Sequence, residues 1–206
     1  MVPPYWFFGF DSLMEFIAFG IAIAVAFQAM KGYILAKERT LLYLNFSFVL
    51  LGAGLLVDGL ASLIVLLSRF HRGFLFLSAV GYTVSFAAQA LAYGILVFAY
   101  LKQTRFWSGQ VAMAALPLIL FEHNPVTELI LVFLLVYIAT QTGMNYSASR
   151  TTNSLLVFGA FTSLAIGHVF FLLFTVAPVF FPFGHIAQLF GFLLLLAMLF
   201  RVNQPQ

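Results

Sequence analysis

The sequence predicts an all-α integral membrane protein with about seven transmembrane helices. Of its 206 residues, 64% are hydrophobic and only 7% are charged. The hydrophobic residues fall in successive blocks of roughly 17 to 27 residues, and each block is long enough to cross a bilayer as a helix. The blocks are continuous and do not alternate with a period of two, which excludes a membrane β-barrel.

The predicted helices follow one another with short connections. In chain order they are Phe8–Met30, Leu41–Leu67, Leu75–Leu101, Phe106–Phe121, Val126–Asn145, Asn153–Pro178 and Phe183–Phe200. Loops of a few residues leave no room for a soluble catalytic or receptor domain, so residues 1–206 are expected to form a single transmembrane domain. The first helix is expected to be retained, because Asp11 and Glu15 stand where a signal peptide would be basic.

The positive charges are distributed unequally over the two sides of the predicted bundle. One side collects Lys31, Lys37, Arg39, Lys102, Arg105, Arg150 and Arg201, whereas the other side has only Arg69 and Arg72. Because basic loops stay cytoplasmic, we expect a multi-pass protein of the cell membrane with its amino terminus outside and its carboxyl terminus in the cytoplasm. Its basic loops would contact anionic lipid head groups of the bilayer. They are too sparse to form a nucleic-acid-binding surface.

Two residue types are informative through their scarcity. Cysteine is absent, which excludes disulfides, thiolate metal sites, iron–sulfur clusters and a thiol nucleophile. The three lysines, Lys31, Lys37 and Lys102, lie at the predicted cytoplasmic ends of helices, so the last helix has none for a retinal Schiff base. The sequence therefore calls for no cofactor, although zinc and haem b stay open.

The first three and the last three predicted helices show a weak internal repeat. One register without gaps pairs Glu15 with Glu128, Gln28 with Gln141 and Tyr33 with Tyr146. The repeat units would be residues 8–101 and 126–201, in the same orientation and joined by a linker helix at 106–121. Coincidence between apolar helices is the alternative that the sequence leaves open.

This plan of three helices, a linker helix and three more helices is similar in architecture to the SWEET sugar facilitators, which are built from parallel repeats. Those proteins and their PQ-loop relatives carry a proline–glutamine pair near the cytoplasmic ends of repeated helices. In this chain the corresponding glutamines, Gln28 and Gln141, follow Phe27 and Thr140. The architectural resemblance favours a binding site between the two halves.

Two polar residues deep in the predicted membrane form the main candidate site. At 1.5 Å of rise per residue, Asp58 lies about 6 Å and His168 about 5 Å to the outer side of their helix midpoints. They occupy matching helices of the predicted repeat and nearly the same layer, so they are expected to face each other across a central cavity in the outer half of the bundle. Polar groups at this depth are costly, which favours a function for them.

Further polar residues are predicted to surround this pair. Glu15, Glu128, His185 and Gln188 belong to the outer thirds of their helices, and Gln89 lies near mid-membrane. Such an acidic, imidazole-rich layer would bind a proton, a cation or a small polar molecule. Asp11, His71 and His123 are placed at or beyond the outer boundary.

Each candidate also has a structural interpretation. Asp58 lies between Gly54 and Gly59, which permit close helix approach, so it would serve there as a hydrogen-bonding contact between helices. His168 would do the same on its own helix. Glu15, Glu128 and His185 lie within about two turns of helix ends, where side chains reach interfacial water.

The leading functional interpretation is binding of a small solute or ion by a transporter, a facilitator or a membrane sensor. The main alternative is a metal-dependent intramembrane hydrolase. Alkaline ceramidases and progestin-type receptors share a seven-span plan and use a serine, an aspartate and histidines, including a close histidine pair on the last helix. This chain has His185 followed by Gln188 there, so the identity of any metal stays unknown.

Two further alternatives are left open by the sequence. A haem-binding electron-transfer subunit needs two facing histidines, and only His168 is deep, about 16 Å from the turn that precedes the last helix. A non-catalytic role, as a homo-oligomer or as a subunit of a larger membrane complex, would use the buried polar residues for assembly.

Overall fold

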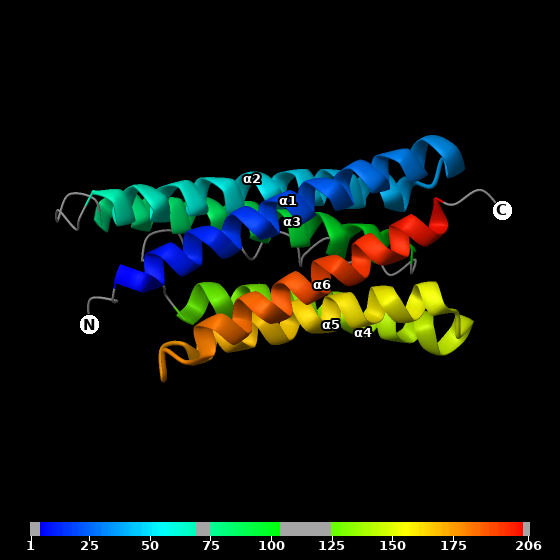
Figure 1. Cartoon of the computed structure of the whole chain (residues 1–206). Helices are drawn as coiled ribbons and strands as arrows, with labels where there is room; N and C mark the ends of the chain where they lie inside the picture. The colour runs from blue at the N-terminus through cyan, green and yellow to red at the C-terminus, as the bar shows by residue number, and fades with distance from the viewer. Residues whose placement is uncertain (1–4, 69–74, 104–124, 204–206) are drawn as a thin grey trace.

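The protein is a bundle of long apolar helices (Figure 1). The computed structural model describes residues 5–68, 75–103 and 125–203. Within these ranges it has six helices: α1 (Tyr5–Ala36), α2 (Arg39–Leu67), α3 (Leu75–Gln103), α4 (Pro125–Ser149), α5 (Thr152–Leu173) and α6 (Phe180–Val202). Each of the six is long and apolar enough to cross a membrane. The chain is therefore a multi-pass helical membrane protein.

Six of the predicted spans coincide with these helices, and the predicted span Phe106–Phe121 lies outside the described residues. The largest boundary difference is at the end of α1, which continues to Ala36, beyond the predicted end at Met30, and the boundaries around the last turn differ as well. Helix α5 ends at Leu173, before the predicted end at Pro178, and α6 begins at Phe180, before the predicted start at Phe183. Proline lacks a backbone N–H, so Pro178 lies in the turn, whereas Pro182 is tolerated in the first turn of α6.

The helices pack as a closed ring in chain order, each against the next and α1 against α6. Figure 1 shows α1–α3 on one side of the bundle and α4–α6 on the other. The hydroxyl of Tyr82, near the start of α3, bonds to Thr127 and Glu128 in the first turn of α4. Helices α3 and α4 thus begin at the same end of the bundle.

Small residues permit α5 and α6 to pack closely against each other. A Cβ atom added at Gly167 of α5 would lie 3.0 Å from the backbone oxygen of Gly184 in α6. A Cβ atom at Gly191 of α6 would lie 2.9 Å from the backbone oxygen of Ala160 in α5. Backbones this close are typical of small-residue contacts between membrane helices.

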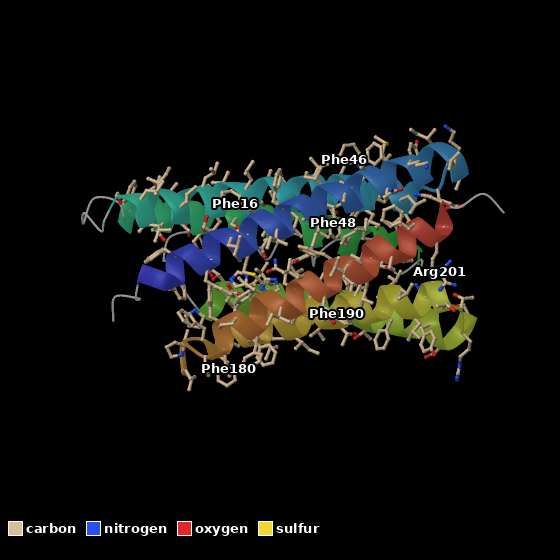
Figure 2. The ribbon with its side chains drawn as sticks, viewed as in Figure 1. Phe16, Phe46, Phe48, Phe180, Phe190 and Arg201 are labelled. Atoms are coloured by element: carbon tan, nitrogen blue, oxygen red, sulfur yellow. The ribbon has the colours of Figure 1, made fainter. Side chains whose placement is uncertain are left out.

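The outer surface is apolar, as expected of a protein in lipid. Figure 2 shows Phe46 at the outer edge of the bundle, and Phe46 and Phe190 are each 55% exposed. Phe48, in contrast, is completely buried between the helices. Soluble monomers rarely expose such extensive apolar surface, so these side chains are matched to a bilayer.

The described basic residues cluster at one end of the bundle. They are Lys31, Lys37, Arg39, Lys102, Arg150 and Arg201, which lie at or near the last turns of α1, α3, α4 and α6 or at the start of α2. Figure 2 shows Arg201 at one end of α6 and Phe180 at the other. The prediction that Lys and Arg collect on one side thus agrees with the described part of the fold.

The connections α1–α2 and α4–α5 have the same geometry. Lys37 and Arg150 follow directly after α1 and α4 with positive φ angles of 56° and 52°. Each donates its backbone N–H to the carbonyl of a tyrosine four residues earlier, Tyr33 or Tyr146, at 2.8 Å. This is a left-handed helix cap. Tyr33 and Tyr146 are also paired with each other in the predicted internal repeat. The shared helix cap favours this repeat, which stays a prediction.

Candidate functional site

A cavity lies at the end of the bundle opposite the basic residues. All six helices contribute to its lining, and its volume is about 70 Å³. That is room for roughly five water molecules, or for an ion with part of its hydration shell. The polar lining residues are Asp11, Glu15, Asp58, Ser62, Ser78, Tyr82, Gln89, Glu128, His168, Thr175, His185 and Gln188.

The structure brings all seven candidate residues of the sequence analysis to this one cavity. Asp58 and His168 line it from α2 and α5, and Glu15, Gln89, Glu128, His185 and Gln188 complete the set. Their binding role stays a prediction. His71 and His123 lie outside the described residues.

One group of side chains, which we call the closed cluster, comprises Tyr82, Thr127, Glu128 and His168. The two oxygens of Glu128 have separate partners: His168 Nδ1 lies 2.9 Å from Oε2, and the Tyr82 hydroxyl donates to Oε1 at 2.9 Å. Tyr82 is also 2.7 Å from the hydroxyl of Thr127. The carboxylate of Glu128 is thus held by hydrogen bonds from two neighbouring helices.

A second group, the open cluster, comprises Asp11, Glu15, Ser62 and His185. The His185 ring lies between two carboxylates of α1: Nε2 is 3.3 Å from Asp11 Oδ1, and Nδ1 is 4.0 Å from Glu15 Oε1. The direction at Nε2 is not that of a hydrogen bond, and Glu15 Oε2 also has no hydrogen-bond partner. The other oxygen of Asp11 accepts a bond of 2.6 Å from Ser62.

Helical spacing and close packing place these groups. Asp11 and Glu15 are four residues apart on α1, so both face the same side of the helix. Asp58 and Ser62 share the same spacing on α2. The two histidines directly follow glycines that bring α5 and α6 together: His168 follows Gly167, and His185 follows Gly184.

Aromatic rings surround the histidines. Phe171 contacts both of them, with its ring centroid 5.7 Å from that of His168 and 4.9 Å from that of His185. Phe181 lies 4.6 Å from the His185 ring. An apolar wall of this kind lowers the local dielectric and strengthens every charge interaction in the cavity.

Asp58 does not act as the helix contact suggested by its flanking glycines. Its side chain is partly buried, faces Gly81 of α3 and forms no hydrogen bond with another described residue. Gly54 and Gly59 do permit close approach, toward α3 and α1 respectively. The glycines therefore form the close contacts between these helices, and the carboxylate of Asp58 lines the cavity.

One sequence expectation about exposure needs correction. Glu15 and His185 are expected from the sequence to reach interfacial water, but they are only 6% and 2% exposed because neighbouring helices cover them. Asp11, which the sequence places at or beyond the outer boundary, lines the cavity from α1. Sequence reasoning also missed Ser62 and Tyr82. The four-residue spacings from Asp11 to Glu15 and from Asp58 to Ser62 were the available signal.

The cavity suits a metal ion better than a haem group. Asp11, Glu15 and His185 each offer one ligand atom, and these atoms lie within 4.8 Å of one another. This is a plausible donor set for a metal ion. A porphyrin does not fit, because the volume of about 70 Å³ accommodates only a few waters and the rings of both histidines are packed against Phe171.

No family model, curated protein or solved structure matches this chain. The chemistry of the cavity is therefore the main indication of what the protein does.

Proposed function

We propose that this protein binds a small cation in the cavity and either carries it across the membrane or senses it. One observation carries the proposal: four of the six acidic residues of the whole chain, Asp11, Glu15, Asp58 and Glu128, line this single cavity. Among the described lining residues none is lysine or arginine. A site for an anion would have the opposite composition.

The charge balance of the cavity requires a positive partner. Four ionised carboxylates facing two histidines leave two negative charges even when both imidazoles are protonated. Burying uncompensated charge inside a membrane protein costs several kcal/mol or more. Bound protons or a bound cation supply the compensation. This is also why a neutral sugar, the substrate class of the SWEET facilitators, suits the cavity less well.

The described residues support access to the cavity from one end of the bundle. The exposed residues Pro125 and Thr175 line its mouth. Toward the basic end, the completely buried side chains of Phe48, Tyr93 and Phe192 fill the core. With the basic end cytoplasmic, the cavity would open to the outside of the cell membrane, and release to the cytoplasm would require the two three-helix halves to move.

The test is a cation screen by thermal stability. A ligand that binds only the folded state raises the unfolding temperature, and above Kd the stabilisation grows with the logarithm of the ligand concentration. We expect one class of cation, at constant ionic strength, to stabilise the purified protein in detergent. The stabilisation should be lost in Asp58→Asn and kept in Glu38→Gln, which removes an exposed acidic residue at the other end of the bundle.

Uptake by proteoliposomes then separates a carrier from a sensor. A carrier moves the stabilising cation into the vesicles, and Asp58→Asn abolishes this uptake while leaving insertion intact. The proposal fails if no cation stabilises the protein, or if Asp58→Asn responds to cations as the wild type does.

A metal-dependent hydrolase is the second candidate, favoured by one observation. The donor set of Asp11, Glu15 and His185 leaves metal coordination positions free for water and substrate, as in catalytic sites. Metal-dependent cleavage of amide- or ester-linked lipids by the purified protein, lost in His185→Gln, would establish it in place of transport.

A further inference from the structure

We infer that the open cluster is a binding site for a divalent transition-metal ion, with Asp11, Glu15 and His185 as its ligands. The inference rests on the proposed function, because it names the cation that the acidic cavity takes. The metal ion would bind where α1 and α6 are in contact, which we call the α1–α6 seam. The closed cluster would hold no metal.

The geometry of the three side chains carries the first step. Their ligand atoms lie within 4.8 Å of one another, and His185 Nε2 is already 3.3 Å from Asp11 Oδ1. Ligands of one transition metal at about 2.1 Å lie roughly 3 to 3.5 Å apart. Side-chain shifts on the order of 1 Å would therefore close the site around an ion, without a change in helix packing.

Unpartnered buried atoms supply an independent observation. Glu15 Oε2 has no hydrogen-bond partner although Glu15 is only 6% exposed. His185, the proposed imidazole ligand, is 2% exposed and its Nε2 also has no hydrogen-bond partner. Buried polar atoms are nearly always satisfied, so lone pairs left free in this cavity point to a ligand that would satisfy them.

The donor types select the class of ion. Imidazole with two carboxylates suits Zn²⁺ and its first-row neighbours, whereas Mg²⁺ and Ca²⁺ prefer oxygen ligands alone. Two carboxylates also neutralise a divalent ion, which offsets part of the cost of burying these charges. Three protein ligands leave at least one coordination position open to the cavity, as a site that exchanges its ion needs.

Ser62 is the positioning residue of this site. Its hydroxyl donates to the second oxygen of Asp11 at 2.6 Å, which turns the first oxygen toward His185. Bonds of this kind orient metal ligands and tune affinity by about 10- to 100-fold. The site thus has both a donor set and a support for one of its ligands.

The test is a Zn²⁺ titration of the full chain in detergent, purified without a polyhistidine tag and treated with chelator. Competition against a chromophoric chelator should show one Zn²⁺ per protein. We expect Asp11→Asn, Glu15→Gln and His185→Gln each to weaken binding by at least about 100-fold. Glu128→Gln, which removes the same charge from the closed cluster, should weaken it by less than about tenfold. Mg²⁺ and Ca²⁺ should not displace the bound Zn²⁺.

The control variant Glu128→Gln distinguishes a specific metal site from a general attraction of cations to the acidic cavity. Equal losses in Glu128→Gln and Asp11→Asn would overturn the inference, because they would mean that the cavity attracts cations by charge alone. Absence of stoichiometric Zn²⁺ binding would overturn it as well. If another cation still stabilises the protein in an Asp58-dependent way, the proposed function stands and only the metal assignment fails.

A second measurement needs no variant and so does not depend on their folding. Co²⁺ added to the wild-type protein should give visible absorption bands of a low-symmetry site with nitrogen and oxygen ligands. A spectrum identical to that of aqueous Co²⁺ would contradict the site.

Discussion

The two histidine–carboxylate clusters of the cavity use the same residue types, but they differ in how many hydrogen-bond partners their carboxylates have. In the closed cluster, both oxygens of Glu128 have partners at 2.9 Å, His168 and Tyr82. In the open cluster, His185 lies 3.3 and 4.0 Å from its two carboxylates, and Glu15 Oε2 has no partner. The carboxylate of Glu128 is satisfied within the protein, whereas the open cluster keeps an unpartnered carboxylate oxygen that an added ligand would satisfy.

The difference separates two roles that buried polar residues can have. A satisfied network rigidifies the packing of the helices that form it. An unsatisfied one costs stability and is retained where a ligand or a reaction uses it. We therefore assign the seam between α4 and α5 to the architecture of the cavity, and the seam between α1 and α6 to binding.

The largest expected effect is on stability. His168→Ala should destabilise the protein by about 3 to 5 kcal/mol, because it leaves the carboxylate of Glu128 buried without its imidazole partner. His185→Ala should cost only about 1 to 2 kcal/mol, because no well-directed hydrogen bond is lost. Unfolding in mixed micelles measures both. A larger loss for His185→Ala would reverse the assignment of the two clusters.

The next effect concerns the glycines that place both histidines. Gly167→Ala should destabilise the protein by about 1 to 3 kcal/mol, because its Cβ would lie 3.0 Å from a backbone oxygen of α6. Gly94→Ala is the matched control, since nothing lies within 4 Å of the added Cβ, and it should be neutral or slightly stabilising. Equal losses of stability in the same unfolding assay would mean that the close packing of α5 and α6 does not contribute to the stability of the protein.

A smaller effect should appear in the pH dependence of the open cluster. Protons and a metal ion compete for the same imidazole nitrogen and carboxylate oxygens, so lowering the pH from 7.5 to 5.5 should weaken Zn²⁺ binding by about tenfold or more. Calorimetric titrations in buffers of different ionisation enthalpy count the protons released. Binding that is independent of pH, with no proton release, would exclude the imidazole as a ligand.

The smallest effect is expected from one hydroxyl of the closed cluster. Tyr82→Phe removes the hydrogen bonds to Glu128 and Thr127 and should cost about 1 kcal/mol of stability. Zn²⁺ affinity should stay within about twofold, because the open cluster is untouched. A larger loss of affinity than of stability would show that the two clusters are coupled.

Much of the fold could be predicted from sequence because lipid imposes a simple rule. Backbone polar groups in a bilayer must be satisfied within the helix, so continuous apolar blocks such as Leu41–Leu67 give the helices directly. The ends near Pro178 were less accurate, since a turn between two apolar helices has no polar boundary. The segment Phe106–Phe121 lies outside the described residues.

The candidate site was predictable in its membership but not in its arrangement. Because burying a polar side chain in a membrane costs free energy, the sequence alone indicates a set of candidate residues. These are Asp58, Glu15, Glu128, His168 and His185, which all line the cavity. Their pairing depends on which helices are neighbours. The contacts of His185 with α1 and of His168 with α4 follow from the order of the ring, which no local pattern encodes.

Nitrogen NMR of the histidines tests the central claim most directly. The chain has four histidines, so ¹⁵N-histidine labelling gives a simple spectrum, in which His185→Gln and His168→Gln identify the two cavity residues. On addition of Zn²⁺ to the protein in detergent, the account predicts that a His185 nitrogen moves to the position of a metal-bound imidazole while His168 keeps its hydrogen-bonded Nδ1. A Zn²⁺-induced shift of His168 with His185 unchanged would contradict it.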